Sequence, residues 1–288
     1  MPTIPADILA SANARSRRLR ELIRAPKILV MPGAHDVLSA RLFETLGFPA
    51  IQGTSGGVAA VYGLQDNELL GRERTVEIYR EMAAALSVPL NADAERGYGG
   101  PEAMAETVRL FVMAGCAGMN VEDSNPHALG SPMTLAPLDA QLAKIRAIVE
   151  ARRALGSEFF LNARVDIFGT VREYRDGMDE AIRRGNAYAE AGADCIFIFR
   201  PPDAEGIRTL VREIKAPLSI LATPDSPPVP ELEALGVARV SYGTVFTRAA
   251  ATAVKRLAEE LLRTGDVRSM LREAMPHPDF QKLLRSTP

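Results

Sequence analysis

One short sequence pattern recurs along this chain and limits the folds open to it. A stretch with helical character ends in glycine, and a short apolar run follows at once, at 46–51, 114–119, 191–196 and 235–240. Glycine just past a helix takes the left-handed cap conformation without the steric penalty of a Cβ atom. A short apolar run between helices is typical of a parallel strand covered on both faces. The pattern therefore predicts alternating helices and parallel strands.

The number of these units favours a closed barrel. Strands are expected at 27–31, 50–53, 89–93, 118–122, 159–164, 195–199, 218–222 and 239–242. Amphipathic stretches at 101–114, 138–155, 178–191 and 244–263 separate several of them. Eight βα units in about 250 residues are typical of a (β/α)₈ TIM barrel. The alternative is an open doubly wound sheet, which usually carries G-x-G-x-x-G at its first turn. The first turn here, 31–36, lacks that motif.

The barrel accounts for most of the chain and leaves a segment at each end. We expect an N-terminal helical segment over 1–26, the catalytic barrel over 27–264, and a helical tail over 265–288 that contacts another subunit. The tail should form one or two short helices interrupted by Pro276 and Pro278. The basic run 15–24 is interpreted as the solvated face of a short helix, with an oligomer contact as the alternative.

Charge and composition exclude several classes of protein. The net charge of −2 provides no basic surface for nucleic acid. No apolar run reaches the roughly 20 residues that a membrane-spanning helix needs. The N-terminus lacks the apolar region of a signal peptide, so a cytoplasmic location is expected. Cys116 and Cys195 lie in apolar settings and are interpreted as small buried hydrophobic residues.

Polar side chains follow the predicted strands at the end where such barrels carry their active sites. The groups that we expect there are His35, Asp36, Thr54, Ser55, Gly56, Gly57, Asp66, Asp93, Glu95, Asn120, Glu122, Asp123, Asn162, Arg164, Asp166, Arg200, Thr223 and Tyr242. Solubility alone does not explain polar groups that gather at one end of an apolar scaffold.

Two of these acids, Asp93 and Glu95, suggest a metal site. Residues two apart on a strand lie on the same face, where two carboxylates repel each other without a counter-charge. Mg²⁺ is the usual counter-ion, because hard cations prefer oxygen ligands, and Mn²⁺ is the alternative. Glu122 would complete the acidic cluster. The other interpretation is an acidic loop that caps the helix starting at Pro101.

A carboxylate-binding site is expected beside this cluster. Arg164 provides a fixed cationic fork, and the turn 54–57 offers hydroxyl and backbone N–H groups. A metal beside such a clamp would chelate a 2-oxo acid and stabilise a developing enolate. Alternatively, Arg164 forms a structural ion pair with Glu122 or Asp166, and the turn is only a turn. None of the five lysines falls at a strand end, which argues against Schiff-base chemistry.

These motifs, taken in order, resemble those of the isocitrate lyase/phosphoenolpyruvate mutase superfamily over about residues 17–265. The resemblance rests on the segments 54–60, 93–99, 120–123 and 162–166 and on Asp66. It implies a (β/α)₈ barrel, Mg²⁺, and chemistry on small 2-oxo or hydroxy acids through an enolate. It also implies homo-oligomers, commonly tetramers built as dimers of dimers, in which a C-terminal helix is exchanged between subunits.

The resemblance also implies roles for individual residues. Asp93 would be the direct metal ligand, Glu95 and Glu122 would hold the metal's waters, and Asp66 would be a second acid near the metal. Thr54, Ser55 and Gly56 would bind the substrate carboxylate, with Arg164 on its other side.

The chain departs from the superfamily pattern at two places. Glu95 stands where the superfamily usually has aspartate, one methylene shorter. The loop 124–134 lacks the lysine and the catalytic cysteine that isocitrate and methylisocitrate lyases carry there, and neither cysteine of this chain can substitute. His127 is the loop group that could donate or accept a proton near neutral pH, or else it caps the loop.

Three functional hypotheses follow. The first is a Mg²⁺-dependent lyase that cleaves a C–C bond of an oxaloacetate-like or methylisocitrate-like acid through a metal-stabilised enolate. Decarboxylation would tolerate the missing cysteine. The second is P–C bond chemistry on phosphonopyruvate, for which only Asn125 is available in the loop. The third is a barrel that binds a 2-oxo acid without turning it over.

Overall fold

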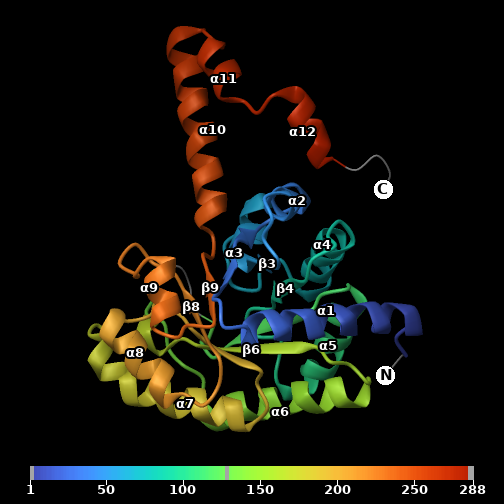
Figure 1. Ribbon diagram of the computed structural model, residues 1–288, viewed down its shortest axis with the longest axis vertical. Helices are drawn as coiled ribbons and strands as arrows, with labels where there is room; N and C mark the ends of the chain where they lie inside the picture. The colour runs from blue at the N-terminus through green and yellow to red at the C-terminus, as the bar shows by residue number, and fades with distance from the viewer. Residues whose placement is uncertain (1–2, 127–129, 285–288) are drawn as a thin grey trace.

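The computed structural model describes residues 3–126 and 130–284, and its centre is a barrel of parallel strands (Figure 1). The strands pair in the order β1-β9-β8-β7-β6-β5-β4-β3-β2, and every pair is parallel. Their bounds are β1 (Leu29–Met31), β2 (Gly33–Ala34), β3 (Ile51–Gly53), β4 (Leu90–Asp93), β5 (Gly118–Glu122), β6 (Phe160–Val165), β7 (Cys195–Ile198), β8 (Leu218–Leu221) and β9 (Arg239–Ser241).

The barrel closes through a strand that is interrupted at Pro32. β1 pairs with β9, whereas β2 pairs with β3, and only this proline separates β1 from β2. Proline has no backbone N–H to donate, so the ladder breaks at that position. The two pieces act as one strand, and each predicted strand range overlaps an observed strand. The predicted (β/α)₈ barrel is therefore confirmed.

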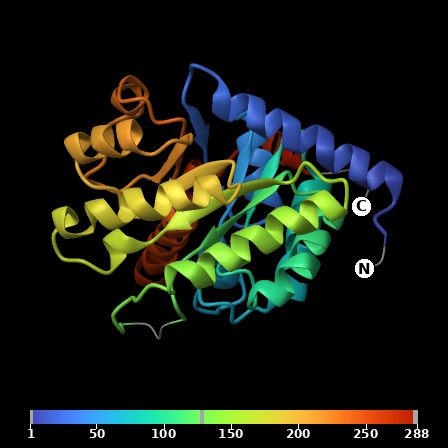
Figure 2. The same ribbon diagram turned by 90° about the horizontal axis from the view of Figure 1, so that it is seen from below.

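Helices cover the outside of the barrel (Figures 1 and 2). The α-helices of the described residues are α1 (Ala6–Arg24), α2 (Val37–Thr45), α3 (Ser55–Val61), α4 (Arg72–Ala84), α5 (Met104–Met113), α6 (Leu138–Ala154), α7 (Met178–Glu190), α8 (Ala204–Glu213), α9 (Val229–Ala234), α10 (Val245–Thr264), α11 (Arg268–Glu273) and α12 (His277–Leu283). Short 3₁₀ turns are η1 (Pro101–Ala103), η2 (Ile167–Gly169) and η3 (Tyr174–Gly177).

Helix α1 lies against the N-terminal end of the barrel, where the chain enters the strands. Leu19 and Ile23 are buried in a cluster with Phe160, at the start of β6. Arg15 donates to the carbonyls of three residues outside α1, each at 3.1 Å, and Arg20 pairs with Asp194 at 3.0 Å. The prediction of a solvated basic face is thus wrong for Arg15 and Arg20, which fasten this helix to the barrel. With this end covered, the opposite end is left for a site.

The inside of the barrel contains a row of amides, in which Asn120 and Asn162 were expected from the sequence and Gln52 and Asn91 were not. Asn91 donates to Gln52 at 3.0 Å and to Asn120 at 2.9 Å, and Asn162 donates to the same Asn120 oxygen at 2.7 Å. Arg239 is fully buried and donates to Gln52 from the other side. Because buried amides are costly without partners, this row joins several strands into one rigid floor.

The C-terminal helices extend away from the barrel (Figure 1). Helix α10 buries none of its residues, and Leu262 within it is 88% exposed. Helix α12 returns to α2, where Arg41 donates to the carbonyl of Leu283. Pro276 separates the two tail helices as predicted, but Pro278 lies within α12 and interrupts nothing. Among the described residues no helix combines the length and apolar character that crossing a membrane requires.

Candidate active site

A cavity of about 360 Å³ opens at the C-terminal ends of the strands. Its size suits a small organic acid, because ligand pockets in proteins begin at roughly 300 Å³. Acids from β4, β5 and the loop before α4 line one part of it, and Phe197, Phe199 and Leu221 line another. A cavity is therefore present at the end of the barrel where the site was predicted.

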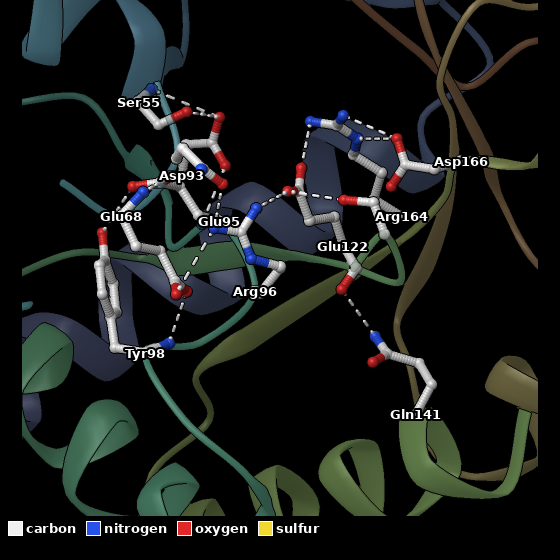
Figure 3. A network of polar contacts seen from close by, with 12 residues as sticks. Ser55, Glu68, Asp93, Glu95, Arg96, Tyr98, Glu122, Gln141, Arg164 and Asp166 are labelled. Atoms are coloured by element: carbon white, nitrogen blue, oxygen red, sulfur yellow. Dashed lines mark hydrogen bonds and ion pairs between the residues drawn. The ribbon is translucent and has the colours of Figure 1, made fainter. Parts of the chain in front are cut away.

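Asp93 ends β4 and contacts the first turn of α3. The Ser55 hydroxyl donates to its carboxylate at 3.0 Å, and the backbone N–H groups of Ser55 and Glu95 lie at 3.4 and 3.3 Å (Figure 3). Burial raises the pKa of Asp93 to about 6, and the negative charges of Asp66 and Glu122 add to the rise, whereas Arg164 opposes it. An ionised Asp93 is therefore poorly compensated by the protein alone.

Glu95 reaches the cavity through a turn and not along the strand. β4 ends at Asp93, and the backbone of Glu95 is left-handed, with φ of +47°. Its carboxylate accepts hydrogen bonds from the backbone N–H of Glu68 and from the Tyr98 hydroxyl. Burial, followed by the charge of Asp66, raises the pKa of Glu95 to about 8. The alternative of an acidic loop that caps the next helix finds no support in these contacts.

Asp66 lines the cavity from the loop between α3 and α4. A Cβ atom added to Gly56 would lie 2.9 Å from the Asp66 carboxylate, so this close approach depends on a glycine at that position. Burial raises the pKa of Asp66, and the charge of Glu122 raises it further. Asp66 and Gly56, two of the predicted site residues, thus lie side by side.

Arg164 is held between two carboxylates. Its Nη1 lies 2.7 Å from Glu122, while Nε and Nη2 lie 2.8 and 2.7 Å from Asp166 (Figure 3). The alternative of a structural ion pair is therefore realised with both acids. The side chain still lines the cavity, and each terminal guanidinium nitrogen carries a further N–H group. Arg164 can hold its partners and still donate to a ligand.

Several contributors to the site were missed in the sequence. Arg96 lies 3.3 Å from Glu122 and 3.6 Å from Glu68, and Ser124 donates to Glu122 at 3.0 Å. Tyr98 donates its backbone N–H to Glu68 at 2.9 Å. Arg96 and Tyr98 belong to the segment 93–99 on which the resemblance rests, and Ser124 directly follows the segment 120–123. Their positions in the sequence could have marked them as candidates.

Several other residues considered in the sequence analysis do not line the cavity or lie outside the described residues. Asp36 caps α2, where it accepts the Ser39 N–H at 2.7 Å. Asp123 is buried outside the cavity with Arg184 and Tyr188. His127 lies outside the described residues. Both cysteines are buried, and burial raises their pKa values to about 12, as expected of inert hydrophobic positions.

The acids fit a hard cation held by few direct contacts. Among residues 3–126 and 130–284, no group of three His, Cys, Asp or Glu side chains is arranged to hold a metal ion directly. Mg²⁺, however, typically takes one or two carboxylates and keeps several waters. The donors here are all oxygen atoms. Burial raises the pKa values of Asp66, Asp93 and Glu95, and repulsion between neighbouring carboxylates raises them further. A cation among them would relieve that repulsion.

Comparisons with known proteins agree with this geometry. The family model described as phosphoenolpyruvate phosphomutase matches residues 19–262. The 2,3-dimethylmalate lyase of Eubacterium barkeri is 31% identical over 93% of each chain. The 2-methylisocitrate lyase of Bacillus subtilis is 32% identical over 86% of this chain and 82% of its own. A crystal structure of phosphonopyruvate hydrolase in complex with oxalate and Mg²⁺ is 29% identical, with a TM-score of 0.82 over 93% of this chain and 94% of that one. This protein therefore belongs to the phosphoenolpyruvate phosphomutase family, within the PEP mutase/isocitrate lyase superfamily.

Proposed function

We propose that this protein is a magnesium-dependent lyase that cleaves a carbon–carbon bond of a small 2-oxo or 2-hydroxy carboxylic acid. One observation carries the proposal: buried acids, Arg164 and Ser55 together line one small cavity at the C-terminal end of the barrel. Two relatives, similar over most of their length, are named as lyases of 2,3-dimethylmalate and 2-methylisocitrate. The names support this class of reaction over simple binding.

The acids would hold the cation. Asp93 is proposed as the direct ligand, and Glu95 and Glu122 as acceptors for the metal's waters. Mg²⁺, when bound, supplies Lewis-acid stabilisation of the enolate that forms as the carbon–carbon bond breaks. Arg96 and Ser124 fix the orientation of Glu122 through contacts of 3.3 and 3.0 Å.

The carboxylate of the substrate would lie between α3 and β6. Thr54, Ser55 and Gly56 offer backbone N–H and hydroxyl groups at the start of α3, and Arg164 faces them from β6. Because Glu122 and Asp166 hold the Arg164 guanidinium in place, it binds a carboxylate with little loss of rotational freedom. Phe197 and Phe199 line the same cavity, and their apolar rings would help to exclude bulk water from it.

A proton must move in such a cleavage, and Asp66 is our candidate to carry it. It lines the cavity, and burial raises the pKa of its carboxyl group, which brings that pKa closer to the range in which a carboxyl group exchanges protons during catalysis. His127 remains a second hypothesis for the same step. Replacement of each in turn, Asp66→Asn and His127→Ala, would separate the two, because only the true proton carrier should be required for turnover.

The exposed C-terminal helices are proposed to bind a second copy of the chain, in a homotetramer built as a dimer of dimers. Val254, Leu262 and Leu271 are 67%, 88% and 70% exposed in the single chain. Light scattering on the full chain and on a Leu262→Glu variant tests this: the variant should be smaller, and equal masses would contradict the proposal.

A proton NMR time course with excess Mg²⁺ tests the activity. 2,3-Dimethylmalate, 2-methylisocitrate, oxaloacetate and phosphonopyruvate would each be mixed with the wild-type protein, with Glu122→Gln, and with wild-type protein in EDTA. Cleavage of a carbon–carbon substrate that is lost in both controls is the expected result. Turnover of phosphonopyruvate alone would favour P–C chemistry, and turnover of none would favour a binding barrel.

A further inference from the structure

One cation at the mouth of the cavity has no assigned role. Arg96, Arg164 and Arg200 all line the cavity. The first two are paired with carboxylates, Arg96 with Glu122 and Arg164 with Glu122 and Asp166. Within the part of the chain that the structure describes, Arg200 has no hydrogen bond or ion pair, and its contact is with a ring.

The position of Arg200 is set by an unfavourable backbone. It follows β7, and its φ is +50°, in the left-handed region that side-chain-bearing residues rarely adopt. Pro201 comes next, and a residue before proline normally favours extended conformations. Residues held in such conformations cluster at ligand sites, where the strain places a side chain. Solubility alone would not require an arginine at this strained position.

The ring of Phe199 connects Arg200 with the inner arginine. The Arg164 guanidinium carbon lies 4.1 Å from the ring centroid, and that of Arg200 lies 5.5 Å from it. Both arginines also line the same cavity, so a molecule bound there can contact both. Arg200, whose side chain is exposed, also lines a second cavity, and Asp66 and Met133 likewise line both cavities. The charge of Arg200 thus lies at the boundary between the two cavities.

We propose that Arg200 binds a second anionic group of the substrate, at the end away from the carboxylate that Ser55 and Arg164 hold. This inference rests on the proposed function and deepens it: Arg200 is the residue that would bind the distal group of the acid, a carboxylate or a tetrahedral phosphonate-like group. Arg200 acts in recognition, and it determines specificity between acids with one and with two anionic groups.

Isothermal titration calorimetry with excess Mg²⁺ tests the inference. The probes are pyruvate, with one carboxylate, 3,3-difluorooxaloacetate, with a second carboxylate, and 3-sulfopyruvate, with a tetrahedral sulfonate. Each is titrated into wild type, Arg200→Gln and Arg208→Gln, the last being an exposed arginine of α8 away from the cavity. Equal melting temperatures would show that all three proteins are folded.

Arg200→Gln should weaken binding of a dianionic probe by about tenfold or more, since a lost charged hydrogen bond has that effect. Pyruvate binding should stay within about twofold, and Arg208→Gln should change nothing. If Arg200→Gln weakens binding of only one of the two dianionic probes, that probe identifies the distal group as a carboxylate or as a tetrahedral group. If Arg200→Gln weakens the binding of all three probes equally, or of none, the proposed role of Arg200 would be overturned while the proposed function would stand. No binding of any probe to wild type would overturn both.

Discussion

Replacement of Arg164 by glutamine should strongly destabilise the fold. The Arg164 side chain is 13% exposed and lies 2.7 Å from both Glu122 and Asp166, whose side chains are 11% and 0% exposed. Its removal leaves two buried carboxylates without their shared cation. Among the described residues, Glu122 keeps Arg96 and Ser124 as partners, whereas the Asp166 side chain keeps none. Breaking a buried pair from one side typically costs about 3–5 kcal/mol. For a chain of this size the melting temperature should fall by on the order of 10 °C.

Urea unfolding at neutral pH measures this cost, and a second substitution tests its cause. Asp166→Asn removes one of the stranded charges, so the double variant should recover about 1–3 kcal/mol of the loss. The control is Arg183→Gln, which breaks a pair of the same 2.7 Å distance with Glu180 at the surface and should cost less than about 1 kcal/mol. A loss at Arg164 as small as in the control, or no coupling with Asp166, would refute the reasoning.

Three further predictions concern stability. Burial raises the pKa of Asp93 to about 6 and that of Glu95 to about 8, so the folded metal-free protein binds more protons than the unfolded chain. The stability of the metal-free protein in EDTA should therefore be greatest at acidic pH and fall as the pH rises through these two pKa values. Thermal melts that show the opposite trend would contradict this prediction. Gly53→Ala places a Cβ atom 2.0 Å from the Tyr79 ring. This overlap should lower the free energy of unfolding in urea by at least about 2 kcal/mol. Unchanged stability would mean that the ring can move. Arg239→Met removes a buried cation whose Nε and Nη1 have no partner among the described residues. Urea unfolding should therefore show that stability falls by less than about 1 kcal/mol or rises. A fall of about 3 kcal/mol would contradict this and point to a further partner of Arg239.

The barrel could be predicted because its signals are local. Glycine at 47, 115, 192 and 236 has positive φ, as a cap between a helix and a strand requires. The apolar runs that follow become buried strands, and the count of eight strands, together with the missing G-x-G-x-x-G motif, favours a closed barrel. The polar residues at the strand ends could be predicted for the same reason, since parallel strands bring their C-terminal ends together.

The rest of the site depends on contacts that no sequence pattern describes. Gln52 and Asn91 occupy inward positions that a strand pattern reserves for apolar side chains, and the closed barrel brings them within reach of each other. Glu95 reaches the cavity because its backbone adopts the left-handed conformation, which the alternation of side chains along a strand does not predict. Arg15 looks solvated in the sequence because its carbonyl partners lie far along the chain.

Titration of oxalate with and without Mg²⁺ tests the central claim most directly. Oxalate resembles the planar enolate of a 2-oxo acid, and it needs neither an identified substrate nor turnover. If the buried acids hold a cation beside Ser55 and Arg164, oxalate should bind the wild-type protein only when Mg²⁺ is present. Asp93→Asn should abolish that binding while the protein remains folded. Oxalate that binds equally well in EDTA, or to Asp93→Asn, would contradict the metal-dependent site.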